Sequence, residues 1–344
     1  MAHSSRLTSL EQLEDHLSQP PPGVVDTMGG LEGDLLVLGV GGKIGPSLTR
    51  MARRADEEAG IQRRIIGVAR FSTPDLRERL ESWGIETIAC DLLDRDGLAA
   101  LPDVPNILYL PAQKFGTTGQ ESRTWAMNTY LAGMVCERFP KSRIVAYSTG
   151  NVYPLTPVDS GGPTEETPLA PVGEYAMTAM GRERMFAFFS EKFGIPVSIV
   201  RLNYAVEMRY GVLVDIAQKV LAGQPVDLTM GYFNVIWQGD CNAMTLRCFD
   251  HVSSPPFAIN VTGAETLSVR HCAEQFAERM GKAATFTGEE ADTALLSNAS
   301  RSFELFGPAT VSVEQMMDWI TDWLQQGGET HNKPTHFQAR DGKF

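Results

Sequence analysis

The chain has 344 residues, of which 43% are hydrophobic and 21% are charged. These proportions are typical of a globular protein with a large core, built as one large domain or two coupled ones. The formal net charge is -12, from 30 basic and 42 acidic residues, and the basic residues are scattered along the chain. This charge argues against nucleic acid or an anionic membrane surface as a partner. A small anionic ligand therefore needs a local basic pocket.

Five cysteines lie far apart, with no C-x-x-C pair and no histidine at a spacing typical of a zinc site. We expect reduced, mostly buried thiols and no metal. Glu11, Glu14 and Asp15 stand where a signal peptide needs an apolar core, and no later apolar run is long enough to cross a bilayer. The sequence therefore predicts a cytoplasmic protein.

Residues 1–33 are expected to form an N-terminal arm with one short helix. A cap residue precedes leucines at helical spacing, and the Pro-Pro-Pro-Gly run at residues 20–23 ends this pattern. We expect the helix to pack on the main domain.

From residue 34 onward, short apolar strands alternate with helical stretches. Such alternation is typical of a parallel sheet with helices on both faces. We therefore predict an α/β fold, with a Rossmann-type doubly wound parallel sheet over residues 34–203. The expected strands are residues 35–38, 64–68, 87–90, 107–110, 144–147 and 197–202. The first expected helix ends at residue 59, and the next three span residues 74–83, 123–139 and 174–192.

The alternation loosens after residue 203. We predict that residues 204–326 form a smaller, mixed substrate-binding lobe, of which some segments return to the sheet. Residues 327–344 are polar, and we expect this tail to be bound to the surface or mobile. Within the lobe the expected elements are helices at 212–221 and 268–280 and a short strand region at 234–237.

The first predicted strand runs directly into a glycine-rich turn and a helix. Gly39, Gly42 and Gly45 stand in this turn, with Lys43 and Ile44 between them. Glycines let the backbone turn tightly and approach a pyrophosphate, whose charge then lies against free amides and the positive end of the helix dipole. We expect the segment to bind a dinucleotide. The alternative is a turn that joins a strand to a helix without a ligand, as in many folds.

Arg70 follows the second strand, at the position that faces the adenosine ribose in this architecture. An acidic residue there binds the 2'-hydroxyl group, whereas a cation attracts a 2'-phosphate, and Lys43 adds a second cation nearby. The sequence therefore favours NADP as the cofactor over NAD. The alternative is that both cations are solvated surface residues. Asp91, after the third strand, either binds the adenine edge or caps a helix.

The chain also carries an ordered series of short motifs, which runs Gly39-x-x-Gly42-x-x-Gly45, Cys90-Asp91-Leu92, Leu110-Pro111-Ala112, Asn128, Ser148-Thr149-Gly150-Asn151-Val152-Tyr153, Glu166-x-Pro168-x-x-Pro171-x-x-x-Tyr175 and Asn260-Val261-x-Gly263. In this order they resemble the motifs of the extended short-chain dehydrogenase/reductase family, which includes NAD-dependent sugar-nucleotide epimerases and dehydratases. The resemblance covers roughly residues 34–325 and is far more specific than the glycine turn alone.

The resemblance implies roles for several residues. Thr149 would orient the substrate oxygen and Tyr175 would transfer its proton. Leu92, Ala112 and Asn203 would join the glycine turn, Arg70 and Asp91 in holding the cofactor. It also implies a homodimer, formed through the helices predicted at residues 123–139 and 174–192.

One departure bears on the chemistry. The family's lysine follows its tyrosine by four residues, and here that position holds Ala179. A lysine one helical turn along would favour the tyrosine phenolate, whereas an unassisted tyrosine has a pKa of about 10, so about one molecule in a thousand is phenolate at neutral pH. Loss of the lysine thus harms alcohol oxidation more than ketone reduction. Arg182 or Lys114 could compensate, but for each we expect a solvated surface position.

Substrate contacts are expected in the loops around this tyrosine and in the second lobe. Lys114 and Asn151 lie near the predicted mouth of the site. Arg209 could pair with a carboxylate or phosphate, and Trp237 could stack on a sugar or ring face. The alternatives are that Trp237 belongs to the core and that Arg209 bridges to Glu207 or another acid.

Two functions are compatible with these patterns. The first is an NAD(P)-dependent oxidoreductase or epimerase/dehydratase-like enzyme that acts by hydride transfer on a small carbonyl, hydroxyl or sugar-derived substrate. A variant within this class reduces a conjugated enone, as the similar progesterone 5β-reductase-like enzymes do. The second is a catalytically degenerate NAD(P)-binding protein that senses the cofactor or binds a partner, which the alanine at position 179 favours.

Overall fold

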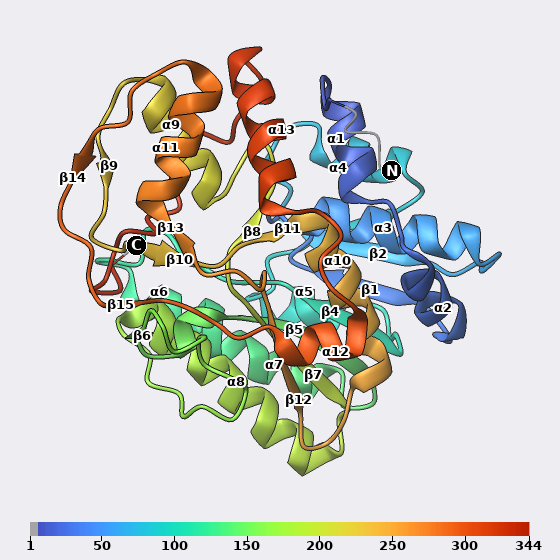
Figure 1. The fold of residues 1–344 in the computed structure, drawn as a ribbon. Helices are drawn as coiled ribbons and strands as arrows, with labels where there is room; N and C mark the ends of the chain where they lie inside the picture. The colour runs from blue at the N-terminus through green and yellow to red at the C-terminus, as the bar shows by residue number, and fades with distance from the viewer. Residues whose placement is uncertain (1–5, 344) are drawn as a thin grey trace.

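A parallel sheet of seven strands forms the centre of the molecule in the computed structural model, which describes residues 6–343 (Figure 1). Its strand order is β12-β7-β5-β4-β1-β2-β3. The order reverses between β1 and β4, and at such a point the loops diverge to leave a crevice at the carboxyl ends of the strands. The strands are β1 (Leu35–Leu38), β2 (Ile65–Ala69), β3 (Glu86–Ala89), β4 (Asn106–Tyr109), β5 (Arg143–Thr149), β7 (Val197–Leu202) and β12 (Phe257–Val261).

Helices cover both faces of this sheet, because the central strands are apolar on both sides and must be buried on both. The core on one face is shared with α2 (Pro22–Gly30), α3 (Gly45–Glu58), α4 (Leu76–Ser82) and α10 (Gln238–Arg247). The core on the other face is shared with α5 (Arg95–Ala99), α7 (Leu131–Arg138) and α8 (Glu174–Phe193). The predicted Rossmann-type sheet is confirmed.

Two helical segments differ from the sequence prediction. The proline run does not only end α1 (Leu10–Leu17), because Pro22 also begins the helix α2 at a position where proline is favoured. The single helix predicted over residues 123–139 is divided into α6 (Glu121–Trp125), the π-helical turn η1 (Ala126–Tyr130) and α7. A π-helical turn is rare and is found often at functional sites.

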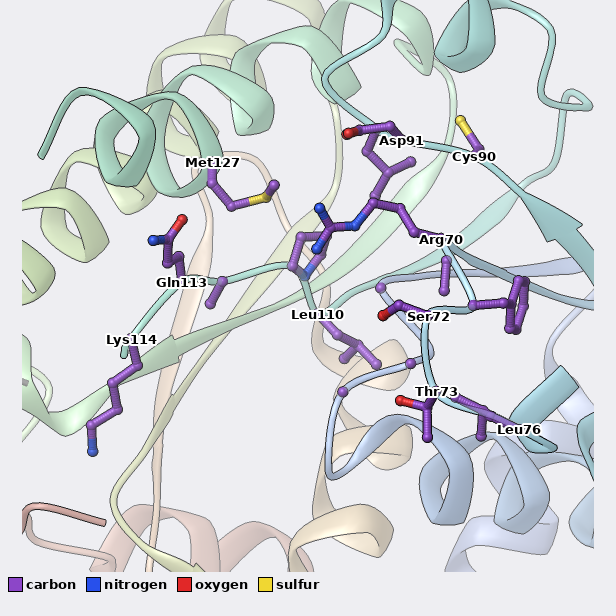
Figure 2. A pocket seen from close by; sticks show the side chains of 18 of the residues that line it. Arg70, Ser72, Thr73, Leu76, Cys90, Asp91, Leu110, Gln113, Lys114 and Met127 are labelled. Carbon is purple, nitrogen blue, oxygen red and sulfur yellow. The ribbon is translucent and has the colours of Figure 1, made fainter. Parts of the chain in front are cut away.

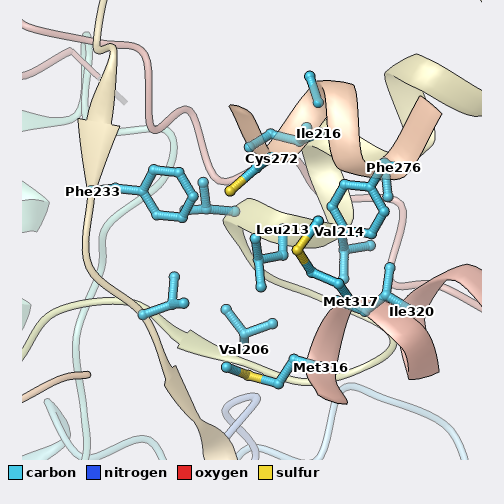
Figure 3. Close-up of a cluster of buried hydrophobic side chains, with 14 of the residues drawn as sticks. Val206, Leu213, Val214, Ile216, Phe233, Cys272, Phe276, Met316, Met317 and Ile320 are labelled. Atoms are coloured by element: carbon cyan, nitrogen blue, oxygen red, sulfur yellow. The ribbon is translucent and has the colours of Figure 1, made fainter. Parts of the chain in front are cut away.

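The second lobe has its own apolar core, which Figure 3 shows around Phe233, Cys272 and Phe276. Its helices are α9 (Val212–Leu221), α11 (Val269–Met280) and α13 (Val313–Gln325), and α1 packs against the same core. Within residues 204–326, β12 returns to the large sheet beside β7. The remaining elements are β6 (Thr156–Pro157), β8 (Ala205–Val206), β9 (Val226–Asp227), β10 (Tyr232–Phe233), β11 (Ile236–Trp237), β13 (Leu267–Ser268), β14 (Phe286–Thr287), β15 (Thr293–Ala294), α12 (Ser300–Phe306), η2 (Gly150–Val152) and η3 (Cys248–His251).

The polar segment after α13 is docked on the second lobe. The backbone N–H and hydroxyl of Thr335 donate hydrogen bonds of 2.7 and 2.6 Å to the Asp215 carboxylate on α9. Phe337 is 3% exposed and faces Phe233. Arg340 donates to the Thr293 carbonyl at 2.7 Å. Residues 327–343 therefore follow a fixed path across the lobe.

Among residues 6–343, no helix has both the length and the apolar character needed to cross a membrane. The five cysteines are all free thiols, and four of them are buried.

Candidate cofactor and active site

The glycine turn after β1 has a backbone that side chains would obstruct. Gly39 has a φ of +78°, and a Cβ at this position would lie 3.0 Å from the Pro111 backbone nitrogen. A Cβ at Gly45, the first residue of α3, would lie 2.2 Å from the Val40 carbonyl oxygen. These two contacts explain why glycine is required for the turn and for the close start of the helix. Gly42 meets no such contact and is exposed at the turn.

A cavity of ≈ 600 Å³ lies beside the glycine turn (Figure 2), a size typical of cofactor sites. Arg70 and Asp91 lie on one side of it, and Gln113 and Lys114 lie on another. Seven of the predicted site residues line it, namely Gly39, Gly42, Arg70, Asp91, Leu92, Ala112 and Lys114. Lining residues that the sequence analysis missed include Phe71, Ser72, Thr73, Gln113, Phe115, Arg123 and Lys333.

The Arg70 end of the cavity carries hydrogen-bond donors. Phe71 has a φ of +49°, a left-handed conformation that turns the chain after β2, and Arg70, Ser72 and Thr73 are all exposed around it. Asp91 accepts a hydrogen bond of 3.1 Å from the Leu93 backbone, but the helix that follows, α5, is capped by Asp94, so the capping alternative is wrong. Asp91 lines the cavity.

A second cavity of ≈ 200 Å³ lies on the other side of the turn, and Lys43 lines it. The Lys43 Nζ lies 3.5 Å from the ring centroid of Tyr210 and 4.7 Å from that of Phe115. Burial and the nearby charge of Lys333 lower the pKa of Lys43 to about 8. Lys43 is thus not the solvated surface cation of the alternative interpretation. Ile44, the N-cap residue of α3, packs against the sheet core and lines neither cavity.

Thr149 and Tyr175 lie together although they are far apart in sequence. Thr149 ends β5, Tyr175 stands in the first turn of α8, and each is 7% exposed. The Thr149 side chain hydrogen-bonds to Tyr175, and its Oγ1 lies 3.0 Å from Asn151 Oδ1. Burial raises the pKa of Tyr175 above its usual value, while the charge of Arg182 and the hydrogen bond with Thr149 act in the opposite direction.

Lys114 links this pair to the larger cavity. Its Nζ lies 6.0 Å from the ring centroid of Tyr175 and 5.5 Å from that of Tyr204. Burial and the charge of Lys43 lower the pKa of Lys114 to about 8. Lys114 is half-buried and not fully solvated as expected, because its side chain lies among the rings of Phe115, Tyr175 and Tyr204.

The position of the missing lysine is filled by packing. Ala179 is 0% exposed and belongs to a small apolar cluster with Val152 and Tyr153. The expected surface position of Arg182 is wrong, since this residue is 2% exposed. Its guanidinium donates to the Tyr147 carbonyl at 2.6 Å and to the Asn128 carbonyl at 3.2 Å.

Two predicted contacts, Trp237 and Asn203, lie outside both cavities. Trp237 is 3% exposed and packs against Trp319 in the second core, so the core alternative holds. Asn203 is 2% exposed and packs against Gly150, outside both cavities. Like Thr149 and Tyr175, these two residues do not line either cavity. Asn151 is half-buried beside Thr149.

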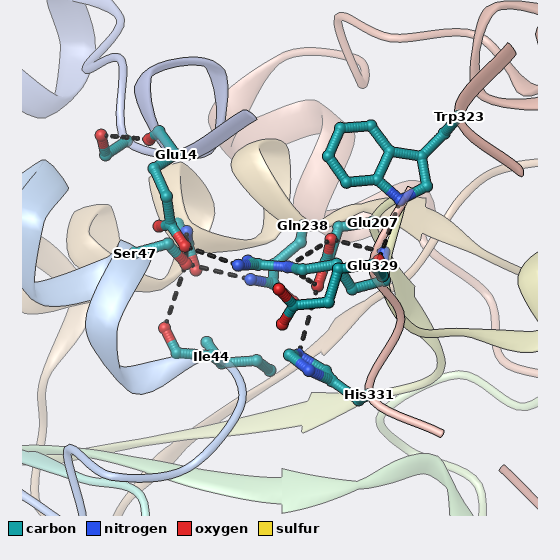
Figure 4. A network of polar contacts seen from close by, with 11 residues as sticks. Glu14, Ile44, Ser47, Glu207, Gln238, Trp323, Glu329 and His331 are labelled. Carbon is teal, nitrogen blue, oxygen red and sulfur yellow. Dashed lines mark hydrogen bonds and ion pairs between the residues drawn. The ribbon is translucent and has the colours of Figure 1, made fainter. Parts of the chain in front are cut away.

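Arg209 forms ion pairs with two carboxylates, those of Glu14 and Glu207, which Figure 4 labels. Its guanidinium lies 2.8 Å from Glu14 and 3.0 Å from Glu207, and it is 8% exposed. His331 lies 3.5 Å from the same Glu207. Arg209 does line the smaller cavity, but the bridging alternative accounts for its charge. We therefore withdraw its assignment as a substrate anion site.

A parallel sheet that reverses its strand order at β1, with a glycine turn and a cavity at this point, defines a Rossmann-type dinucleotide-binding protein. Residues 35–228 match the model of the NAD dependent epimerase/dehydratase family. The chain belongs to this family, whose members are enzymes of the extended short-chain dehydrogenase/reductase type.

Solved structures of low sequence identity share the fold. UDP-glucuronic acid 4-epimerase from Bacillus cereus, in complex with NAD, has a TM-score of 0.70 at 20% identity, over 85% of this chain and 99% of that one. UDP-glucose 4-epimerase from Thermotoga maritima, with UDP-glucose, has a TM-score of 0.69 at 16% identity, over 86% and 99%. dTDP-glucose 4,6-dehydratase from Bacillus anthracis, in complex with NAD, has a TM-score of 0.71 at 17% identity, over 86% and 97%. No curated protein sequence matches the chain significantly.

Proposed function

We propose that the protein is an NAD(P)-dependent oxidoreductase or epimerase/dehydratase-like enzyme that acts by hydride transfer on a small carbonyl, hydroxyl or sugar-derived substrate. The observation that carries this proposal is the hydrogen-bonded pair of Thr149 and Tyr175, which Lys114 connects to the cavity of the glycine turn. A hydroxyl donor and a second hydroxyl that fixes it are the groups that proton transfer to a substrate oxygen requires.

The cavity fits a dinucleotide, because the glycine turn offers backbone amides where a Cβ would obstruct a ligand and the cavity walls carry cations in a chain of net charge -12. Gly39, Gly42 and the start of α3 would hold the pyrophosphate, with Lys43 beside them. Asp91 would hold the adenosine. The nicotinamide supplies or accepts the hydride when bound.

We propose a preference for NADP. Arg70, Ser72 and Thr73 offer a guanidinium and two hydroxyls around the turn after β2, and none of these three is an acid that would bind the ribose 2'-hydroxyl. A 2'-phosphate would gain charge-assisted hydrogen bonds at this place. The similar structures from Bacillus cereus and Bacillus anthracis hold NAD, so the choice of cofactor is the first property to test.

Reduction is the favoured direction of chemistry. Burial keeps Tyr175 protonated at neutral pH, and a neutral phenol can give its proton to an alkoxide that develops on the substrate. Thr149 holds the phenol oxygen in place, and Lys114 and Asn151 would contact the substrate from the two adjacent loops.

We also propose a homodimer through α6, η1 and α8. Large apolar side chains are exposed on these elements, among them Trp125 at 39%, Tyr130 at 46%, Met177 at 42% and Phe188 at 54%. A second copy of the chain would cover this surface, and sedimentation analysis would show a dimer that charged replacements at Tyr130 and Phe188 convert to a monomer.

Cofactor fluorescence tests the proposal most directly. Purified protein is titrated with NADPH and NADH, and a panel of ketones, enones and sugar-derived carbonyls is then screened for loss of nicotinamide absorbance. We expect tighter binding of NADPH and turnover that requires Tyr175. Tight cofactor binding without turnover on the whole panel would favour the second candidate, a cofactor-sensing protein, which is supported by the apolar packing of Ala179. Absence of nucleotide binding would exclude both.

A further inference from the structure

Arg182 is a deeply buried cation that the described part of the chain leaves without an acidic partner. It is 2% exposed, and within residues 6–343 no carboxylate lies within ion-pair distance of it. Its two hydrogen bonds go to neutral backbone carbonyls, and among the described residues its Nη2 has no hydrogen-bond partner. Because burying an uncompensated charge is costly, such a residue needs a reason to be there.

An acidic residue does stand next to Arg182 in the sequence, but its carboxylate binds other side chains. Glu183, the next residue of α8, is also buried, but its carboxylate binds Arg201 at 2.8 Å and accepts a hydrogen bond of 2.5 Å from Ser148. Glu183 thus neutralises Arg201 of β7, whereas Arg182 lies outside this pair. The Arg182 charge therefore acts on its surroundings without local neutralisation.

Helix geometry directs this charge toward Tyr175. The two residues are seven positions apart on α8, which places them two turns apart on the same face, with Ala179 between them. Long helical side chains lean toward the N-terminus, so the Arg182 side chain leans toward the end of α8 that carries Tyr175.

The two carbonyl acceptors hold the guanidinium against the site. Tyr147 lies on β5, two residues before Thr149, which hydrogen-bonds to Tyr175. Asn128 lies in the π-helical turn η1, and its side chain accepts a hydrogen bond of 2.7 Å from the backbone of Gln113, a cavity-lining residue. The charge is therefore fixed between two walls of the candidate active site.

We propose that Arg182 is a positioning residue whose fixed charge stabilises the Tyr175 phenolate, the role that the alanine at position 179 leaves open. This inference rests on the proposed function of Tyr175 as the proton-transferring group. In the reducing direction the Tyr175 O–H bond breaks, the proton joins the substrate alkoxide, and the phenolate that remains carries the negative charge. Arg182 compensates this charge through the protein interior, where electrostatic interactions are weakly screened.

The direction of the electrostatic effect supports the inference. The Arg182 charge lowers the pKa of Tyr175 against the raising effect of burial. A guanidinium keeps its charge throughout the pH range in which enzymes work, whereas the pKa of Lys114 is lowered to about 8. Arg182 can therefore act at any working pH.

The test compares three variants by the ultraviolet absorbance of tyrosinate as the pH is raised. Because the Arg182 charge also acts on Tyr109, the curve of each variant is corrected with that of the same variant carrying Tyr175→Phe, and the difference is the signal of Tyr175. Arg182→Gln removes the charge but keeps a hydrogen-bond donor, and Arg182→Lys keeps a charge. Arg184→Gln removes an exposed arginine from the same helix as a matched control. Tryptophan fluorescence at each pH shows that the protein is still folded.

We expect Arg182→Gln to raise the Tyr175 midpoint by at least about one pH unit, which is a tenfold smaller phenolate fraction at a given pH. Arg182→Lys should restore at least half of the shift, and Arg184→Gln should leave the midpoint unchanged. A purely structural role predicts the opposite sign, because a loosened interior would expose Tyr175 and lower its midpoint. An unchanged or lowered midpoint in Arg182→Gln overturns the inference.

The titration needs no substrate, so it separates this inference from the proposed function. A raised midpoint in a protein that turns over no carbonyl substrate would support the charge coupling and contradict the enzymatic proposal. Where a substrate is turned over, the pH limb of kcat that reports Tyr175 should move with the spectroscopic midpoint in Arg182→Gln. Arg182→Lys serves as the reference variant if Arg182→Gln does not fold, and its midpoint should then lie above that of the unaltered protein by less than one unit.

Discussion

The two ends of the candidate site differ in what their chemistry depends on. At the glycine turn the requirement is on the backbone, because Gly39 needs a positive φ and Gly45 leaves no space for a Cβ. On α8 the requirement is on side chains. There the chain has Ala179 where the family has a lysine, and the buried Arg182 follows three residues later. Cofactor binding and proton transfer can therefore change independently in this fold. Each of the following variants should affect one end of the site and spare the other.

The largest effect is expected at the catalytic end. Tyr175→Phe keeps the buried ring but removes the hydroxyl, and turnover should fall by about 10²- to 10⁴-fold, the usual contribution of a positioned proton donor. The affinity for NADPH should change less than about twofold. Steady-state kinetics and cofactor fluorescence measure the two quantities. Tyr232→Phe, at a half-buried tyrosine outside both cavities, is the control, and equal turnover in Tyr175→Phe and the unaltered protein would contradict the assigned role.

At the cofactor end, Gly45→Ala should weaken both NADPH and NADH by about 10- to 100-fold, because overpacking of this kind costs about 1–3 kcal/mol. The added Cβ would lie 2.2 Å from the Val40 carbonyl oxygen and would displace the amides of the turn. Fluorescence titration gives the affinities. Gly30→Ala meets nothing within 4 Å and should bind both cofactors normally. If Gly45→Ala binds as tightly as Gly30→Ala, the turn does not hold the pyrophosphate.

A smaller and more selective effect is expected at Arg70. Arg70→Ala should weaken NADPH about tenfold, because a charge-assisted hydrogen bond is worth about 1.5–3 kcal/mol and this side chain is exposed to screening. NADH, which has no 2'-phosphate, should bind as before. The ratio of the two dissociation constants is the measurement, and Arg77→Ala on α4 is the matched control. A parallel loss for both cofactors would remove the proposed preference for NADP.

The smallest effect concerns pH. Lys43 has a pKa of about 8 because burial and Lys333 disfavour its charged form. As the pH rises through 8 the ammonium loses its proton and its attraction for a phosphate, so NADPH affinity should fall by about threefold to tenfold between pH 7 and 9.5. Below pH 7 the affinity should level off. Lys43→Gln should flatten this profile, and an unchanged slope in that variant would exclude Lys43 as its cause.

The parallel sheet could be predicted because each buried strand is a local apolar run and each intervening helix has its own periodicity. The glycine turn could be predicted for the same reason, since its geometry is coded by neighbouring residues. The helix after Pro22 was missed because the proline run reads as the end of one helix and is also the beginning of the next. The π-helical turn in residues 126–130 has no sequence signal that periodicity can detect.

The sequence predicted cavity-lining residues correctly only where they follow the end of a strand. Arg70 and Asp91 follow strand ends, and they line the cavity. Arg182 was expected in solvent because arginine is usually exposed, yet it lies on the helix face of Tyr175 that packs against β5. That shared face was the signal available in the sequence. The positions of Ser72 and Thr73 depend on the left-handed backbone of Phe71, and Lys333 comes from the distant tail. Local sequence patterns could therefore not predict that these three residues line the cavity.

The path of residues 327–343 has a consequence for how the protein is made. Gly39 emerges early in synthesis, but Lys333 of the tail lines both cavities beside the glycine turn. Against the lowering effect of burial, the charge of the Asp215 carboxylate raises the pKa of Lys43, and this carboxylate accepts two hydrogen bonds from Thr335 of the same late segment. A nascent chain on the ribosome can therefore complete the Rossmann sheet well before its ligand site has all of its walls. The candidate ligand site thus combines an early segment of the chain with a late one.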